Sequence, residues 1–583
     1  MASCGKESMA DPVDGLKTRL ADLSLHSYSN LATIASEMGV ERTRFELIPA
    51  LKNVFDDHQN LLEMAEQLGN LTEQVGGPAF SHCLLVPLEY LSGVREPDVR
   101  VKALESLKNV SLLHSVADLK VYFIPLVNRL KIDHSSYRRA SACDLISIAY
   151  ARVPATIRSE LRTNFSELCQ DDESRVRQAA ARNLGDFAKV VESEFLQSDI
   201  IPLLVHLQQD KEDWVRVCTV AASVSIAFLL PQENREQFVM PLVKQYVADE
   251  SWRVRCTFTN YFMDFKKALG SANTTEELVF AFKTLLADND DDVREAAVNK
   301  IVEFCLCLHP SEQETTIIHT ILPCLKQLVV DLNQGIRSVL ASSTVGLFPI
   351  FGKDKTIEHL LPLFLALMKD EFEDVKLSIT SNLDSLNDVI GTQHFSTFML
   401  PVIRELVTER NWRVRRAVFQ TLPLFEIEMW QQGSNGGLRE ILVGFLNDPV
   451  FANREAATTT LEELVQKLGS AWTETVIIPI IGTLSHYSNY KIRLTSLFCI
   501  NVLADVCGQD TLKKTFPIVA KLAYDKVANV RLNVAKTIQK MGSVLDRTVL
   551  VRLSPLLEAL EEDSDDDVRY FANEATNGLG FKN

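Results

Sequence analysis

The stretch that decides the fold lies at residues 356–391 and reads TIEHLLPLFLALMKDEFEDVKLSITSNLDSLNDVIG. Apolar residues recur at helical spacing both before and after the short acidic segment at residues 369–371. The pattern predicts two amphipathic helices joined by a turn, the first bent at Pro362 and the second running from Asp374 to Gly391. Such a hairpin is too small to bury its own apolar faces, so we expect it to stack on neighbouring hairpins.

The same turn recurs along most of the chain, because an apolar residue followed by Arg or Lys returns about every thirty-nine residues. The basic positions are Arg100, Arg138, Arg177, Arg216, Arg255, Arg294, Arg337, Lys376, Arg415, Arg454, Arg493, Arg531 and Arg569. An acidic residue stands six positions before ten of these thirteen, and prolines follow the same period. A period of this length is typical of stacked supersecondary units. The sequence therefore predicts an all-α superhelix of about fifteen helical hairpins of ~39 residues.

The recurring acid and base share one phase, so both lie on the turn edge of the array. We expect them to form a ladder in which the acid of one unit lies beside the Arg of the same or the next unit. Most rungs of such a ladder serve structure, since a buried carboxylate without a partner is costly. Function is then expected at turns that carry unusual neighbours.

Composition restricts the kind of partner and the compartment. The formal charge is −17 and the pI is near 5.3, which disfavours nucleic acid because phosphate binding needs a basic surface. The cysteines mostly fall in apolar helical segments without paired spacing, which indicates free buried thiols. The start of the chain lacks the apolar run of a signal peptide, and no membrane span or membrane insertion is predicted. We expect a cytoplasmic protein, with the nucleus as a further compartment.

A search for catalytic motifs predicts no enzyme, no catalytic residue, no metal and no cofactor. The chain has no glycine-rich phosphate loop, no His-Glu-x-x-His and no Gly-x-Ser-x-Gly. Residues 288–292 alternate acids as a calcium loop does, yet the sixth position is Val293 and the twelfth is Asn299. We interpret this segment as an acidic turn.

Aromatic residues at the turns are the strongest sign of binding. Residues 252–255 and 412–415 both read Trp-Arg-Val-Arg, and Trp214, Phe451 and Tyr490 lie in related turns. Aromatic and Arg side chains dominate the energetics of protein interfaces, which predicts a protein-binding edge. The alternative is that these rings pack only against a neighbouring unit.

The array resembles the scaffold (A) subunits of protein phosphatase type 2A, which are HEAT-repeat proteins. The resemblance rests on GVERTR at 39–44, AEQLG at 65–69, VGGP at 75–78, SWRVR at 251–255, TIEHLLPLFL at 356–365 and LFCINVL at 497–503. It implies one continuous HEAT-repeat solenoid over residues 1–583. Residues 1–40 would form a degenerate N-terminal capping repeat, residues 41–314 the regulatory-subunit-binding repeats 2–8, residues 315–392 the connecting repeats 9–10, and residues 393–583 the catalytic-subunit-binding repeats 11–15.

The resemblance also implies a function and contact residues. The chain would be a non-catalytic scaffold that forms a heterodimer with a phosphatase catalytic subunit, and a heterotrimer when an exchangeable regulatory B-type subunit joins them. The implied catalytic-subunit contacts are Trp412, Arg413, Phe451, Tyr490, Lys491, Val527 and Asn529. The implied regulatory-subunit contacts are Asp172, Arg177, Trp214, Trp252 and Arg253. Phe451 stands where the family has Tyr, so the ring contact is expected without a hydroxyl hydrogen bond.

Two alternatives come from other classes of protein. A nuclear-transport receptor is also an acidic helical solenoid, but it normally has more units and binds a small GTPase near its start. A tubulin-binding HEAT array uses turn Trp and basic residues, but it comes in shorter blocks joined by basic linkers, which this sequence does not show.

Overall fold

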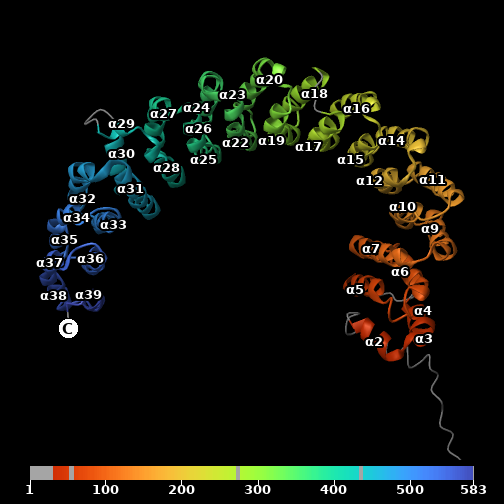
Figure 1. Ribbon diagram of the computed structural model, residues 1–583, viewed down its shortest axis with the longest axis horizontal. Coiled ribbons are helices and arrows are strands. Elements are labelled where there is room, and N and C mark those ends of the chain that lie inside the picture. The colour runs from red at the N-terminus through yellow and green to blue at the C-terminus, as the bar shows by residue number, and fades with distance from the viewer. Residues whose placement is uncertain (1–29, 52–57, 271–275, 432–436, 582–583) are drawn as a thin grey trace, which may run out of the picture. The chain divides into compact units, whose positions relative to one another are not determined.

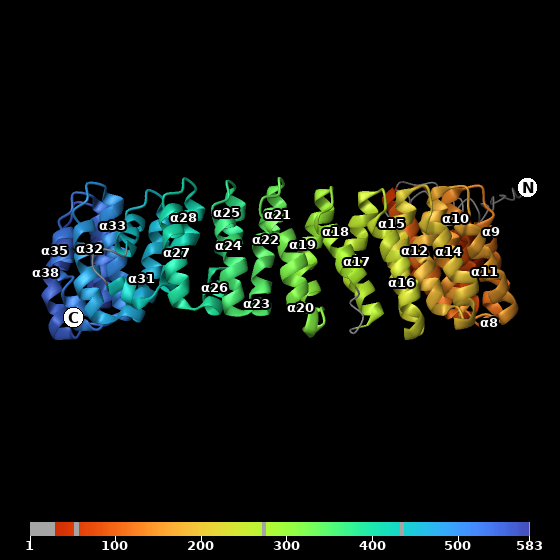
Figure 2. The same cartoon turned by 90° about the horizontal axis from the view of Figure 1, so that it is seen from above.

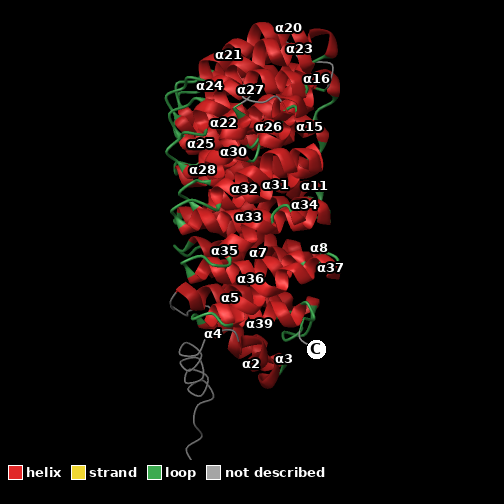
Figure 3. Cartoon of the chain, turned by 90° about the vertical axis from the view of Figure 1, so that its left-hand side faces the viewer, coloured by secondary structure: helices red, strands yellow, loops and turns green. Residues whose placement is uncertain are grey.

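The structure is a computed structural model that describes residues 30–51, 58–270, 276–431 and 437–581. All regular secondary structure in these ranges is helical, as Figure 3 shows. The predicted all-α fold of stacked helical hairpins is confirmed. Most of the predicted capping repeat at residues 1–40 lies outside the described residues, and the functional boundaries at 314 and 392 stay predictions.

The chain divides into two compact units, residues 1–297 and residues 298–583. The first unit contains, with η for short 3-10 or π turns, α2 (Leu31–Met38), α3 (Val40–Arg42), η2 (Thr43–Leu47), α4 (Ile48–Leu51), α5 (His58–Asn70), η3 (Pro78–Leu84), α6 (Leu85–Leu91), α7 (Pro97–Leu113), α8 (Val116–Asp118), η4 (Leu119–Phe123), α9 (Ile124–Lys131), α10 (Ser136–Tyr150), α11 (Ala155–Cys169), α12 (Ser174–Val190), α13 (Ser193–Phe195), η5 (Leu196–Ile200), α14 (Ile201–Gln208), α15 (Asp213–Leu229), α16 (Gln232–Val247), α17 (Trp252–Leu269) and α18 (Glu276–Leu286).

The boundary between the units falls in α19 (Asp291–Leu306). The second unit continues with α20 (Pro310–Thr316), η6 (Ile317–Ile321), α21 (Leu322–Leu328), α22 (Gln334–Ser343), η7 (Thr344–Leu347), α23 (Phe348–Lys355), η8 (Thr356–Leu360), α24 (Leu361–Met368), α25 (Glu373–Thr380), α26 (Leu383–Ile390), α27 (Thr392–Leu406), α28 (Trp412–Phe419), η9 (Leu422–Leu424), α29 (Ile427–Gln431), α30 (Leu438–Leu446), α31 (Phe451–Trp472), η10 (Thr473–Ile477), α32 (Ile478–Leu484), α33 (Tyr490–Val506), α34 (Gln509–Lys513), α35 (Phe516–Leu522), α36 (Ala528–Met541), α37 (Arg547–Leu550), η11 (Val551–Leu553), α38 (Ser554–Glu561) and α39 (Asp566–Gly578).

Within each unit the helices form hairpins that stack side by side (Figure 1). The second helices of successive hairpins contact one another, as in the series α10, α12, α15 and α17 and the series α31, α33, α36 and α39. In each unit the turns within the hairpins lie along one edge, which Figure 2 shows from above. This stacking buries the apolar faces that a single hairpin leaves exposed.

The prolines bend the first helices without ending them, as the sequence predicts. In six of the described hairpins a five-residue π turn precedes the proline, and η8 followed by Pro362 in α24 is one example. Pro lacks the amide that an α-helix needs at that point, so the preceding turn widens and the helix continues. Pro241 and Pro401 lie inside α16 and α27, which also continue past them.

The second helix of the deciding stretch differs from its prediction. It runs as α25 and α26 with a break at Ser381 and Asn382. The Ser381 hydroxyl donates to the carbonyl of Ser378 at 2.8 Å, and the Asn382 amide donates to the same carbonyl at 2.9 Å. Such side-chain bonds to the backbone compete with the helix. The predicted end at Gly391 is confirmed, since that residue has φ 81° and ψ 150°.

One described segment, Gln334–Met368, is long and apolar enough to cross a membrane by length and composition alone. It is a run of five short helical pieces, and Gly352 interrupts the run with φ 68°. Phe348, Leu360 and Phe364 from this segment are buried in the core. These observations fit core helices of the array.

Candidate functional site

The turn edge of each unit carries a ladder of buried ion pairs, and Arg177 with Asp210 illustrates its geometry. Arg177 Nε lies 2.5 Å from Asp210 Oδ2, and its Nη2 lies 3.0 Å from Oδ1. The third nitrogen, Nη1, donates to the carbonyls of Asp171 and Asp172 in the turn of its own unit. Asp210 Oδ1 also accepts the amide of Glu212, which closes the turn that follows it. Each Arg therefore joins the turn of its own hairpin to the turn of the next hairpin.

The same arrangement repeats along both units. The two-pronged pairs are Arg139 with Asp171, Arg177 with Asp210, Arg216 with Asp249, Arg255 with Asp288, Arg337 with Asp370, Arg415 with Asp448, Arg493 with Asp525 and Arg531 with Asp563. Lys376 and Glu409 form a simpler rung of the same phase. The predicted ladder is confirmed, and in each rung the acid comes from the hairpin that follows the one with the Arg.

The pairs hold the carboxylates in their ionised form. Burial of Asp448 raises its pKa, but hydrogen bonds from Arg415, Asn453 and the amide of Val450 outweigh burial, so the pKa lies below its ordinary value. The Arg531 hydrogen bond lowers the pKa of Asp563 in the same way. Charge-assisted two-pronged bonds of this kind are stronger than bonds between neutral groups.

One rung was assigned to the wrong residue from the sequence. Arg139, and not Arg138, forms the pair with Asp171 and donates to the carbonyl of Asp133. Arg138 instead binds the Asp133 carboxylate at 3.0 Å. The pattern of an apolar residue before a basic one selected Arg138, whereas the spacing of six residues from Asp133 identifies Arg139.

Two arginines of the ladder phase depart from the pattern. Arg100 donates to the carbonyls of Val94 and Arg95, and its guanidinium stacks on the ring of Tyr137 at 4.5 Å. Arg454 donates to the carbonyls of Asp448 and Pro449, yet its Nε has no hydrogen-bond partner and the residue is 5% exposed. Burial lowers the pKa of Arg454, an effect that Asp448 opposes.

The position opposite Arg454 explains its missing partner. Tyr487 stands one period after Asp448, and its carbonyl accepts Arg493 Nη1 as the carbonyl of Asp448 accepts Arg454 Nη1. A tyrosine therefore occupies the turn position where the other rungs have an acid. The rung between these two turns lacks its carboxylate.

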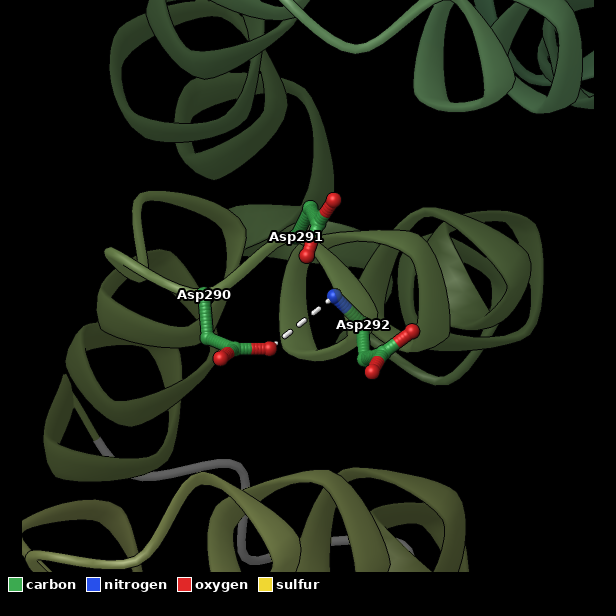
Figure 4. Close-up of side chains that lie close together, drawn as sticks. All are labelled: Asp290, Asp291 and Asp292. Carbon is green, nitrogen blue, oxygen red and sulfur yellow. Dashed lines mark hydrogen bonds between the residues drawn. The ribbon is translucent and has the colours of Figure 1, made fainter.

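The acidic turn at residues 288–292 behaves as the sequence predicts. Carboxylate oxygens of Asp290, Asp291 and Asp292 lie within 4.8 Å of one another (Figure 4). Asp290 Oδ1 accepts a hydrogen bond from the amide of Asp292 at 3.1 Å. Asp288 binds Arg255 and accepts the amide of Asp290, so it is a ladder residue. Acidic side chains at the start of α19 interact favourably with the positive end of the helix dipole, which accounts for the cluster.

Three of the predicted regulatory-subunit contacts, Trp214, Trp252 and Arg253, gather at two successive turns of the first unit. The Arg253 guanidinium lies 5.0 Å from the ring of Trp214 and 4.8 Å from the ring of Trp252. Asp213 accepts the Ser251 hydroxyl at 2.8 Å and lies 3.5 Å from Arg253. Trp214 is 53% exposed. The arrangement presents a rigid aromatic and cationic surface.

The other two predicted residues of this group differ from each other. Asp172 is exposed in its turn, whereas Arg177 is 7% exposed and fully used by the ladder. The structure therefore gives Arg177 a structural role in the free chain.

The predicted catalytic-subunit contacts lie at successive turns of the second unit. The Arg413 guanidinium lies 5.0 Å from the ring of Trp412, and Phe451 is 54% exposed over Arg454. Tyr490 and Val527 are half-buried, and Lys491 and Asn529 are exposed. Asn411 and Asn489 accept the amides of Arg413 and Lys491, which fixes the starts of α28 and α33.

The thiols behave as predicted in the part of the chain that the structure describes, where ten cysteines are free. Cys143, Cys169, Cys305, Cys324 and Cys499 are buried, and Cys218 and Cys256 are half-buried. Burial raises the pKa of Cys305 and of Cys499 to about 12. A thiol with so high a pKa is a poor nucleophile.

Comparison with known proteins identifies the repeat. The family model "PPP2R1A-like HEAT repeat" matches residues 271–352, and the model "HEAT repeat" matches residues 161–191. Both matches identify HEAT repeats within the chain. A chain in the solved structure "Kap95p Binding Induces the Switch Loops of RanGDP to adopt the GTP-bound Conformation" covers 98% of this chain with a TM-score of 0.54 and 11% identity, over 77% of its own length. At that identity the likeness concerns the fold alone.

Curated relatives carry the narrower resemblance. Over 167 residues the chain is 47% identical to the beta isoform of the 65 kDa regulatory A subunit of serine/threonine-protein phosphatase 2A from Homo sapiens, and 46% identical to the PP2A 65 kDa regulatory subunit of Drosophila melanogaster. Over 169 residues it is 42% identical to the PP2A regulatory A subunit of Schizosaccharomyces pombe. The aligned stretch spans 28% of this chain and 28% of each relative. The resemblance to the A subunits is confirmed over this stretch.

Proposed function

We propose that this HEAT-repeat chain is a non-catalytic scaffold of a protein phosphatase type 2A holoenzyme. The observation that carries the proposal is its identity of 42–47% with relatives named as regulatory A subunits. The turn chemistry supports it, because exposed Trp, Phe and Arg side chains occur at regular intervals on a rigid ladder. Such side chains form the energetic centres of protein interfaces.

The proposal assigns one partner to each group of turns. The turns of Trp412, Phe451 and Tyr490 hold the catalytic subunit, and the turns of Trp214 and Trp252 hold an exchangeable regulatory B-type subunit. Two partners on one scaffold raise the effective concentration of one for the other, which directs serine/threonine dephosphorylation without chemistry by the scaffold. The complexes are a heterodimer and a heterotrimer in the cytoplasm and in the nucleus.

The test is capture of a phosphatase type 2A catalytic subunit by the purified full chain. Replacing both Trp412 and Tyr490 by Ala should raise the dissociation constant by about thirtyfold or more. That factor corresponds to a loss of ~2 kcal/mol, the contribution of one dominant interface residue. Trp252→Ala is the matched control, since it lies in the same Trp-Arg-Val-Arg motif of the first unit. Equal weakening by both variants, or phosphopeptide hydrolysis by the chain alone, contradicts the proposal.

The two alternative functions gain no support from these observations. The fold likeness to the Kap95p chain stands at 11% identity, and none of the curated relatives quoted above is a transport receptor or a tubulin-binding protein. A pull-down with a small GTPase and cosedimentation with microtubules test them directly.

A further inference from the structure

A groove lies on the helix faces of the first unit, and one of its ends reaches Arg175 at the start of α12, next to the turn of Asp172. It consists of two adjoining cavities of about 220 Å³ and about 680 Å³ on α7, α10 and α12. Both cavities are lined by Val101, Leu104, Asp144 and Arg182, so they form one continuous depression, the α7–α10–α12 groove.

One end of the groove is cationic. The ring of Tyr137 lies between two guanidinium groups, with Arg100 at 4.5 Å and Arg175 at 4.3 Å from its centroid. Arg100 lacks the carboxylate of a regular rung, because Asp133, the acid of the next turn, is bound by Arg138. The stacked ring holds both cations in place while their outer nitrogens stay available to a ligand.

The charges that line this end do not cancel. Arg100, Arg175 and Arg182 face one carboxylate, Asp144, which accepts Arg182 at 3.3 Å and Asn183 at 2.9 Å. Three positive groups against one negative group leave a local excess of two positive charges on a chain whose formal charge is −17. Burial lowers the pKa of Arg100 and the charge of Arg175 adds to that effect, as expected for cations held together.

The rest of the groove has an apolar floor. Val101 is 57% exposed and Leu112 is 55% exposed on α7, and Ile148 from α10 and Val190 from α12 also line it. Charged side chains at its rim are Glu105, Lys108 and Asp186. Exposed aliphatic residues gathered in a concave surface next to fixed charges are typical of a binding site.

We propose that the α7–α10–α12 groove binds a segment of a partner protein in which an oxyanion side chain, a carboxylate or a phosphate, precedes a run of aliphatic residues. The guanidinium forks of Arg100 and Arg175 fit either oxyanion, and the aliphatic residues cover Val101 and Leu112. Nucleic acid does not fit, since Glu105 and Asp186 line the groove beside Lys108 and would repel its phosphates, and the chain is acidic overall. The inference does not rest on the proposed phosphatase role.

The experiment is a fluorescence anisotropy titration of the full chain into a short labelled peptide, Glu-Glu-Asp followed by Leu-Leu-Ala-Leu, at physiological salt. The peptide should bind saturably, and Arg175→Glu and Val101→Asp should each weaken binding at least tenfold. Both replaced side chains are exposed, so the variants should remain folded. Matched controls are Arg95→Glu and Val121→Asp, which change the same charge or the same exposed valine outside the groove and should stay within twofold.

Further arms separate the sources of the anion. A phosphoserine peptide that binds more tightly than the Glu peptide would identify phosphate as the preferred group and support the proposal. No saturable binding of either peptide, equal losses in the controls, or displacement by inorganic phosphate as efficient as by unlabelled peptide would overturn it. Capture of the phosphatase catalytic subunit by Arg175→Glu, measured in parallel, should be unchanged, so the two proposals fail separately.

Discussion

The rung that lacks its acid gives the sharpest prediction: Tyr487→Asp should supply the carboxylate that Arg454 lacks. The guanidinium is already oriented, because Arg454 Nη1 donates to the carbonyl of Asp448 at 2.7 Å, as Arg415 Nη1 does to that of Glu409. In the intact neighbouring rung, Arg415 Nε lies 2.9 Å from Asp448 Oδ2 and Nη2 lies 3.1 Å from Oδ1. The new side chain therefore meets a preformed site.

The magnitude follows from the burial of Arg454, which is 5% exposed with Nε unpaired. A buried charge left without its partner typically costs ~3–5 kcal/mol, and the added carboxylate is itself desolvated in part. We expect a net gain of about 2 kcal/mol in the free energy of local opening between α31 and α33. Amide hydrogen exchange in these two helices should then slow by about thirtyfold.

The gain should also depend on pH in one direction. A carboxylate in an intact rung has a lowered pKa, as Asp448 does, so its stabilisation is present above the ordinary Asp value of ~3.9 and is lost as the pH falls through the folded value. Tyr487→Asn is the control for the change of size. Two results would refute the reasoning. One is amide exchange in Tyr487→Asp that is no slower than in Tyr487→Asn at pH 7. The other is the same gain in stability from Tyr487→Asp when Arg454 is replaced by Met.

Three further predictions concern the rungs and caps. Asp448→Ala should destabilise the second unit by ~3–5 kcal/mol in urea unfolding, because Arg415 loses its buried partner, whereas Asp448→Asn keeps one acceptor oxygen and should cost less. Because the pKa values of Asp525 and Asp563 are lowered, the stability they contribute should be present above ~pH 4 and decline on further acidification, which urea midpoints across pH will measure. Gly391→Ala should cost ~1–3 kcal/mol through its φ of 81°. Gly444→Ala in the last turn of α30, where an added Cβ meets no neighbour, should stabilise slightly, so similar thermal shifts in both variants would contradict the conformational explanation.

The repeat period predicted the ladder because acid and base keep a fixed phase in the sequence. The same rule, applied consistently, would have identified Arg139 from Asp133, since the other rungs also place the base six residues after the acid. What the period could not predict is the break between α25 and α26, which depends on local bonds of Ser381 and Asn382 that compete with the helix. The π turns before the prolines could likewise not be predicted from the sequence, because apolar spacing alone does not distinguish a bent α-helix from one with a widened turn.

The groove could have been found in the sequence only by comparing equivalent positions of successive units. Tyr137 and Arg175 each stand two residues before their ladder Arg, so stacking places them side by side although 38 residues separate them. The exposure of Val101 and Leu112 depends on how the helices pack, which the apolar pattern does not reveal. The contact residues assigned to the partners stay predictions for a related reason: exposure shows that Trp214 and Phe451 can bind, and the partner decides whether they do.

Arg100 and Arg454 share one defect and differ in its consequence. Each arginine keeps the hydrogen bonds that a rung makes to the backbone, but lacks a paired carboxylate from the next hairpin. Arg100 is half-buried beside an open cavity, where stacking on Tyr137 leaves its charge available to a ligand. Arg454 is buried, so its charge can be relieved only by opening the contact between its turn and the next or by a new acid at position 487. Exposure thus decides whether a missing rung creates a binding site or a weak point in the stack.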